Sequence, residues 1–199
     1  MRERDKAILD SLKKFRVLNR DQIIAMYFDD TKQAITNCNR VMNRLHLQGA
    51  VRVEKGSRPF CYFHGDSNMK FNSMKAPHFK MIADMYIRMC EYCKPEVFEV
   101  EPKMAIKGSV EPDAYAVWKG TPFFIEVQRS LYTKKVMQTK VNRYLDYFLS
   151  GVWKNPQSLS NTFPVVIILT ESDYEIESIE GVMFLQAKDI DDLVKKYMS

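Results

Sequence analysis

The chain has 199 residues, of which 46% are hydrophobic, so it can bury one sizeable core or two small ones. It contains no run of about 18 apolar residues that could form a transmembrane helix, and its first residues lack the apolar segment of a signal peptide, which predicts a cytoplasmic protein without membrane contact. The net charge of +5 is concentrated in residues 1–64, where 13 lysines and arginines outnumber 7 acidic residues, and a basic segment of this kind favours nucleic-acid binding.

The pattern of apolar residues in the first part of the chain, residues 1–65, predicts a small domain of three helices and a hairpin. Apolar residues recur at helical spacing in residues 8–15 and 23–28, and a third helix follows Asp29–Thr31, which can cap it. Alternating apolar residues on both sides of Lys55–Pro59 predict a hairpin with a basic tip. This is the order of a winged helix-turn-helix domain, and the alternative is a three-helix module that binds another protein through the same face.

The third helix has one face that is rich in amide and basic side chains and free of acids. Its opposite face, which includes Ile35, is apolar and is expected to be buried. Amide groups bind adenine edges, and arginine binds guanine or phosphate, so the polar face suits the major groove of double-stranded DNA. The residues that we predict to contact DNA in this domain are Lys32, Gln33, Thr36, Asn37, Arg40, Asn43, Arg44, Lys55 and Arg58.

Polar residues interrupt the periodicity at residues 66–76 and predict a linker, so that residues 77–199 form a second domain. The helix that starts this domain contains Cys90 and Cys93, whose spacing is zinc-like. No second close pair of cysteines follows in the sequence, and four cysteines are few for a chain of this length. We therefore expect neither a zinc site nor disulfide bonds.

Two apolar runs joined by Lys119–Gly120 predict a hairpin in the second domain. A two-residue turn at this point places Asp113 opposite Glu126 across the two strands. Gln128 then shares the face of Glu126, while Val127 points into the core and offers only its backbone carbonyl. An aspartate, a glutamate and a carbonyl suit a hard cation, so we predict that Mg²⁺ or Mn²⁺ binds here.

The helix after this hairpin is basic. It carries Lys134, Lys135 and Lys140, which we predict to contact DNA phosphate or to supply positive charge near Glu126. The structural alternative is that Glu126 forms an ion pair with Arg129 or with a lysine of this helix. An acidic segment follows toward the end of the chain, and this polarised charge is also consistent with a homodimer.

A nearly continuous aliphatic run at residues 164–170 predicts a strand that is covered on both faces. The predicted order of elements in the second domain, which is a helix, three strands, a helix and a strand, resembles the core of the PD-(D/E)xK nuclease superfamily. The motif of that superfamily matches Pro112-Asp113 and Glu126-x-Gln128, except that Gln128 replaces the usual lysine. The resemblance implies an α+β fold, Asp113, Glu126 and Gln128 as catalytic residues, and metal ligands from Asp113, Glu126 and Val127. A glutamine amide can donate a hydrogen bond but cannot shuttle a proton, so hydrolysis should suffer.

Residues 5–150 also resemble the replication-relaxation family of plasmids, phages and conjugative elements. This resemblance is carried by the winged-helix segment, the helix with His78, Glu111-Pro112-Asp113 and Glu126-Val127. It implies DNA binding in support of replication or strand transfer, together with replication or relaxase proteins. Two functions follow: a DNA-binding accessory protein with a weak or inactive nuclease-like domain, or an active Mg²⁺-dependent endonuclease or nickase directed by its winged helix.

Overall fold

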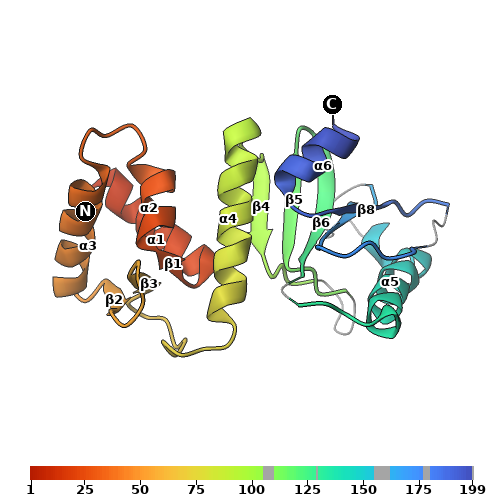
Figure 1. Ribbon diagram of the computed structural model, residues 1–199, viewed down its shortest axis with the longest axis horizontal. Helices are drawn as coiled ribbons and strands as arrows, with labels where there is room; N and C mark the ends of the chain where they lie inside the picture. The colour runs from red at the N-terminus through yellow and green to blue at the C-terminus, as the bar shows by residue number, and fades with distance from the viewer. Residues whose placement is uncertain (105–109, 129, 155–161, 177–179, 199) are drawn as a thin grey trace. The chain divides into compact units, whose positions relative to one another are not determined.

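The protein is a mixed α and β structure, as the sequence predicts. The computed structural model in Figure 1 describes residues 1–104, 110–128, 130–154, 162–176 and 180–198. The chain divides into two compact units, Met1–Arg88 and Met89–Ser199. Within the described residues, every helix is too short or too polar to cross a lipid bilayer.

The first unit contains helices and a three-stranded sheet. Its elements are α1 (Glu3–Phe15), β1 (Leu18–Asn19), α2 (Arg20–Tyr27), α3 (Ala34–Leu47), β2 (Val51–Glu54), β3 (Cys61–His64) and the first part of α4 (Ala76–Tyr92). The hairpin of β2 and β3 is the one that the sequence predicts, and β1 adds a short third strand antiparallel to β3. Strand β1 therefore ties the start of α2 to the hairpin.

Helix α2 begins at a capping box. The Asn19 side chain accepts a hydrogen bond from the backbone nitrogen of Gln22, and the Gln22 side chain accepts one from the backbone of Asn19, both at 2.9 Å. The amide nitrogen of Gln22 also donates to the Lys80 carbonyl and to Asp84 in α4, at 2.9 and 2.6 Å. These bonds attach the first part of α4 to the first unit, which ends at Arg88, inside α4.

Helix α3 begins at Ala34, later than the capping residues of the sequence predict. The hydroxyl of Thr31 donates instead to the Phe28 carbonyl at 2.9 Å and closes the turn after α2. The apolar face of α3 is buried as expected through Cys38 and the residues that follow it at helical spacing. Ile35 was expected on that face but is 54% exposed, because it lies in the first turn of the helix, ahead of the buried stripe.

The second unit is built on a five-stranded sheet in the order β4-β5-β6-β7-β8. Its elements are β4 (Val97–Val100), β5 (Ala114–Trp118), β6 (Thr121–Val127), α5 (Lys134–Leu149), the 3-10 turn η1 (Val152–Lys154), β7 (Val165–Leu169), β8 (Phe184–Ala187) and α6 (Ile190–Tyr197). Strands β4, β5 and β6 are antiparallel, whereas β6, β7 and β8 are parallel. Helix α5 makes the crossover from β6 to β7.

The hairpin of β5 and β6 has the predicted register. Tyr115 pairs with Phe124 and Trp118 with Thr121, so the two-residue turn consists of Lys119 and Gly120. Both turn residues have positive φ angles, 51° and 74°. That conformation suits glycine and is the one that a tight hairpin of this twist requires.

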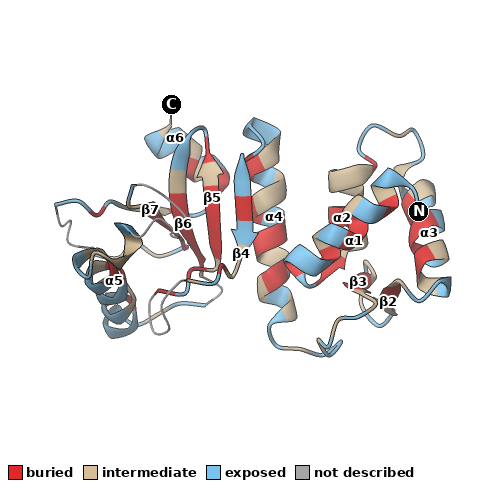
Figure 2. Ribbon diagram, turned by 180° about the vertical axis from the view of Figure 1, so that it is seen from behind, coloured by how far each residue is buried: buried red, intermediate tan, exposed pale blue. Residues whose placement is uncertain are grey.

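The central strands of the sheet, β5, β6 and β7, are buried on both faces over most of their length. Figure 2 shows β5 and β6 buried over most of their length. Tyr115 and Phe124 pack beneath α5 against Tyr144 and Val141, and Ile168 of β7 joins the same cluster. Every residue of β7 from Val166 to Leu169 is buried, which confirms the strand that the aliphatic run predicts.

Candidate functional site

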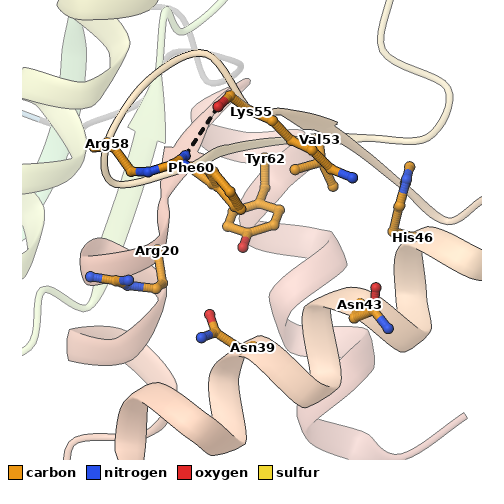
Figure 3. A pocket seen from close by; sticks show the side chains of 9 residues that line it. All are labelled: Arg20, Asn39, Asn43, His46, Val53, Lys55, Arg58, Phe60 and Tyr62. Atoms are coloured by element: carbon orange, nitrogen blue, oxygen red, sulfur yellow. Dashed lines mark hydrogen bonds between the residues drawn. The ribbon is translucent and has the colours of Figure 1, made fainter.

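A groove of about 420 Å³ lies between α3 and the β2–β3 hairpin in the first unit (Figure 3). Helix α3 provides one wall, the hairpin provides the other, and Arg20 lies at the start of α2. The lining residues are Arg20, Asn39, Asn43, His46, Val53, Lys55, Arg58, Phe60 and Tyr62. Local backbone bonds hold this arrangement, since the Arg20 nitrogen donates to the Phe60 carbonyl at 3.0 Å.

None of the nine lining residues of the groove is acidic. Three of them, Arg20, Lys55 and Arg58, are cationic, and Arg20 forms an ion pair with Asp21 at 2.9 Å. The guanidinium of Arg58 lies 4.3 Å from the centre of the Phe60 ring and donates to the Lys55 carbonyl at 3.1 Å. The groove therefore combines amide, aromatic and cationic groups.

The hairpin tip is shaped by Glu54. Its carboxylate accepts hydrogen bonds from the backbone of Gly56 and Ser57 and from the Ser57 hydroxyl. The Ser57 hydroxyl is the main reason that the pKa of Glu54 is lowered. The Glu54 carboxylate is therefore bonded to groups of its own hairpin loop, whereas Lys55 and Arg58 are exposed cations.

The groove brings together Asn43, Lys55 and Arg58 of the residues predicted to contact DNA. Of the other predicted residues, Lys32 and Gln33 are exposed just before α3, Thr36 and Arg40 are exposed on α3, and Asn37 is half-buried; all five lie outside the groove lining. Sequence reasoning did not select Arg20, because its place in the groove depends on the two-residue strand β1, which has too little pattern to be recognised. A helical wheel of α3 does place Asn39 near Asn43.

Arg44 is turned toward the inside of the first unit. One of its guanidinium nitrogens donates to both carboxylate oxygens of Asp5, at 2.9 and 3.0 Å. The Asp5 side chain is 1% exposed and that of Arg44 is 39% exposed. Arg44, although predicted to contact DNA, therefore holds α3 against the start of α1.

Glu126 is the centre of the predicted metal site in the second unit, and it is 3% exposed. Both of its carboxylate oxygens have partners on α5. Lys140 Nζ lies 2.6 Å from Oε2, and the Tyr144 hydroxyl lies 2.6 Å from Oε1. Burial raises the pKa of Glu126 to about 7, with Lys140 opposing the rise and Asp113 adding to it.

Asp113 lies one residue before β5 and continues its register toward Glu126. Its Oδ2 accepts a hydrogen bond from the backbone nitrogen of Val127 at 2.8 Å. The Val127 side chain is buried, as the alternation of the strand predicts. Burial lowers the pKa of Lys140, whereas Glu126 on β6 and Asp113 just before β5 both raise it.

Gln128 is held in a polar cluster rather than left open. Its amide nitrogen donates to the Ser130 carbonyl at 2.6 Å and to the Tyr174 hydroxyl at 2.8 Å. The Tyr174 hydroxyl in turn accepts from the Tyr132 nitrogen at 3.0 Å. Within the described part of the chain, the amide oxygen of Gln128 is buried without a hydrogen-bond partner. The amide nitrogen that could orient a water molecule is therefore used to fix the loops on either side.

The three lysines predicted on α5 differ in their surroundings. Lys134 forms an ion pair with Glu175 at 3.3 Å, in which both side chains are almost fully exposed. Lys135 is exposed, whereas Lys140 is 27% exposed and bonded to Glu126. The pairing of Glu126 with a lysine of α5 is the structural alternative that the sequence leaves open. Arg129, the other candidate partner, lies outside the described residues.

The comparison with protein families matches residues 54–166 to the family described as Replication-relaxation. This match covers more than half of the chain. The chain belongs to the replication-relaxation family. The matched region runs from the end of β2 to the start of β7 and includes Asp113, Glu126 and Lys140, which confirms the family that the sequence resembles. Neither the curated proteins nor the solved structures contain a match to this replication-relaxation chain. The family supports a role in plasmid or other replication-related processes.

Proposed function

We propose that this replication-relaxation protein is a DNA-binding accessory factor of plasmid or phage replication, or of conjugative DNA relaxation. In this proposal the first unit binds double-stranded DNA, and the second unit is a nuclease-like domain with little or no hydrolytic activity. The observation that carries the proposal is the groove between α3 and the hairpin, whose nine lining residues include three cations and no acid. Cationic side chains that neutralise phosphates supply most of the affinity in sequence-independent DNA binding.

The order of elements in the first unit supports a winged helix-turn-helix domain. Helices α1, α2 and α3 are followed by the β2–β3 hairpin, and β1 completes a small sheet with it. In such domains the helix before the wing enters the major groove and the wing contacts the backbone. Helix α3 offers exposed Arg40, Asn43 and Asn39 for this role, and the hairpin offers Lys55 and Arg58.

The second unit supports a PD-(D/E)xK-type core through its order of elements. Three antiparallel strands, a crossover helix and a parallel strand follow one another after α4, with Asp113 just before β5 and Glu126 on the neighbouring strand β6. Weak hydrolysis is proposed because Gln128 stands at the position of the catalytic lysine, and its amide nitrogen already binds Ser130 and Tyr174. The second candidate function is an Mg²⁺-dependent endonuclease or nickase, which the closeness of Asp113 and Glu126 favours.

DNA binding is tested by fluorescence anisotropy with a labelled duplex of mixed sequence over a series of salt concentrations. Arg58→Ala removes a groove cation and should weaken binding and reduce the slope of log K against log salt by about 1. Arg40→Ala tests the exposed face of α3 outside the groove. Lys13→Ala is the matched control, since this exposed lysine lies on α1 away from the groove lining. Equal salt slopes for Arg58→Ala, Lys13→Ala and the unaltered chain would refute the groove as the DNA interface.

Cleavage is tested separately with supercoiled, linear and single-stranded DNA in Mg²⁺ or Mn²⁺. The accessory-factor proposal expects no nicks or cuts above background. Cleavage that disappears in both Asp113→Ala and Glu126→Ala, with DNA binding intact, would establish the nuclease instead. Because the two carboxylates lie in the second unit, these variants leave the groove unchanged.

A further inference from the structure

Lys140 lies against the buried Glu126 carboxylate of the second unit, where a cation would be expected. Its ammonium group lies 2.6 Å from Glu126 Oε2, and both Glu126 and Asp113 raise its pKa. The ring of Tyr132 lies beside it, with 5.6 Å between Nζ and the ring centre. An ammonium that is bonded to a buried carboxylate and lies beside an aromatic ring is well suited to be held as a positive charge.

The oxygens of this centre do not fit a divalent metal as they stand. Glu126 accepts from Lys140 at one oxygen and from Tyr144 at the other, and Asp113 Oδ2 accepts from the backbone of Val127. Mg²⁺ and Mn²⁺ need several oxygen ligands in a nearly octahedral arrangement. Within the described ranges, moreover, no group of three or more His, Cys, Asp or Glu side chains is placed to hold a metal ion.

We propose that the ammonium group of Lys140 is the resident cation of the Asp113–Glu126 centre and takes the place of the divalent metal that nucleases of this type bind there. The inference rests on the proposed assignment of the second unit as nuclease-like. Lys140 is attached to the chain, so its local concentration at Glu126 is fixed by the fold. A metal ion that entered would have to break the bond between Lys140 and Glu126 and would then face the displaced positive charge at close range.

Removal of Lys140 should therefore create metal affinity. We expect Lys140→Met to bind Mn²⁺ at least about tenfold more tightly than the unaltered chain, which corresponds to about 1.4 kcal/mol. Binding is measured on the full chain without DNA by the electron paramagnetic resonance signal of free Mn²⁺. The measurement is made at a mildly alkaline pH, because removing Lys140 takes away a group that lowers the pKa of Glu126. The gain should disappear in the double variant Lys140→Met/Glu126→Gln.

The matched control is Arg143→Met, which removes one positive charge from an exposed position of the same helix. It should leave Mn²⁺ binding as in the unaltered chain. Equal Mn²⁺ affinity in the unaltered chain, Arg143→Met and Lys140→Met would overturn the proposal, because Lys140 would not then compete with metal. Tight Mn²⁺ binding by the unaltered chain that Glu126→Gln abolishes would overturn it as well.

A second measurement needs no variant and applies if Lys140→Met does not fold. Reductive methylation followed by mass spectrometry reports the accessibility of each lysine. Lys140 should react more slowly than the exposed Lys135, and millimolar Mn²⁺ should leave this protection unchanged. Faster methylation of Lys140 in Mn²⁺ would show that metal displaces it and would overturn the proposal. Either failure leaves the DNA-binding proposal intact, because its groove lies in the first unit and these experiments contain no DNA.

Discussion

Replacing Arg44 by methionine removes the partner of a buried carboxylate and should destabilise the first unit. Asp5 has a side chain that is 1% exposed, and it accepts two hydrogen bonds from Arg44 at 2.9 and 3.0 Å. Breaking a buried ion pair from one side costs ~3–5 kcal/mol. Since the Arg44 side chain is 39% exposed, water replaces part of the interaction. We therefore expect the free energy of unfolding to fall by about 2–3 kcal/mol.

The pKa of Asp5 predicts how this loss depends on pH. Burial raises the pKa of Asp5. The hydrogen bonds and charge of Arg44 and the hydrogen bond from the backbone of Arg2 lower it by a larger amount, so the pKa lies below its usual value of 3.8. A carboxyl group with a lowered pKa in the folded state stabilises the protein above its unfolded pKa, and this contribution is lost as the pH falls through the folded value. The difference between the unaltered chain and Arg44→Met should be complete at neutral pH and shrink below about pH 3.8.

Urea unfolding of the full chain can separate the two units. Both tryptophans, Trp118 and Trp153, lie in the second unit, so their fluorescence follows that unit, while circular dichroism follows the helices of both. Arg44→Met should shift the circular dichroism transition and leave the fluorescence transition in place. Arg40→Met, which removes an exposed arginine from the same helix, is the control. If Arg44→Met and Arg40→Met unfolded alike at every pH, the pair with Asp5 would not be stabilising.

The second unit offers four further predictions. Tyr144→Phe removes a buried donor to Glu126 and should lower the stability of the second unit by about 1–3 kcal/mol, seen in the tryptophan-monitored unfolding midpoint. Gln128→Ala should speed hydrogen exchange at the Tyr132 amide, which Gln128 protects through Tyr174; unchanged exchange would show that Gln128 does not fix this loop. Gly120→Ala should lower the free energy of unfolding of the second unit by about 1 kcal/mol, because φ is positive at this position, and Gly120→Asn should lower it by less; tryptophan-monitored unfolding measures both. EDTA and Mn²⁺ should give the unaltered chain the same unfolding midpoint, because a ligand that does not bind the folded state cannot stabilise it.

The register of the β5–β6 hairpin could be predicted from the sequence because its determinants are local. A two-residue turn with glycine at its second position leaves one way of pairing the flanking strands, and Asp113 then comes next to Glu126. Strand β7 could be predicted equally well, because a continuous aliphatic run of this length is typical of a strand that is covered on both faces of a sheet. Both features depend on residues that are close together in the sequence.

Interactions between distant residues could not be predicted in the same way. On a helical wheel Arg44 belongs to the polar face of α3, and its turn toward Asp5 depends on how α1 packs, 39 residues earlier in the chain. The groove position of Arg20 likewise depends on the pairing of β1 with β3. For Glu126, the sequence limits the candidate partners to Arg129 and the lysines of the following helix. Which lysine forms the pair depends on which face of α5 packs on the sheet, and in the structure it is Lys140.

The environment of Glu126 shows how a buried carboxylate on this sheet is compensated without a metal ion. A carboxylate on a buried strand costs free energy unless a cation or several donors compensate it. In a metal-dependent centre the metal provides that compensation, so losing the metal would destabilise the fold. Here Lys140 and Tyr144 provide it, and because they are four residues apart they lie on one face of α5, the face that covers the sheet. The helix that buries Glu126 therefore also neutralises it, and the Asp113–Glu126 pair can be retained for the stability of the second unit.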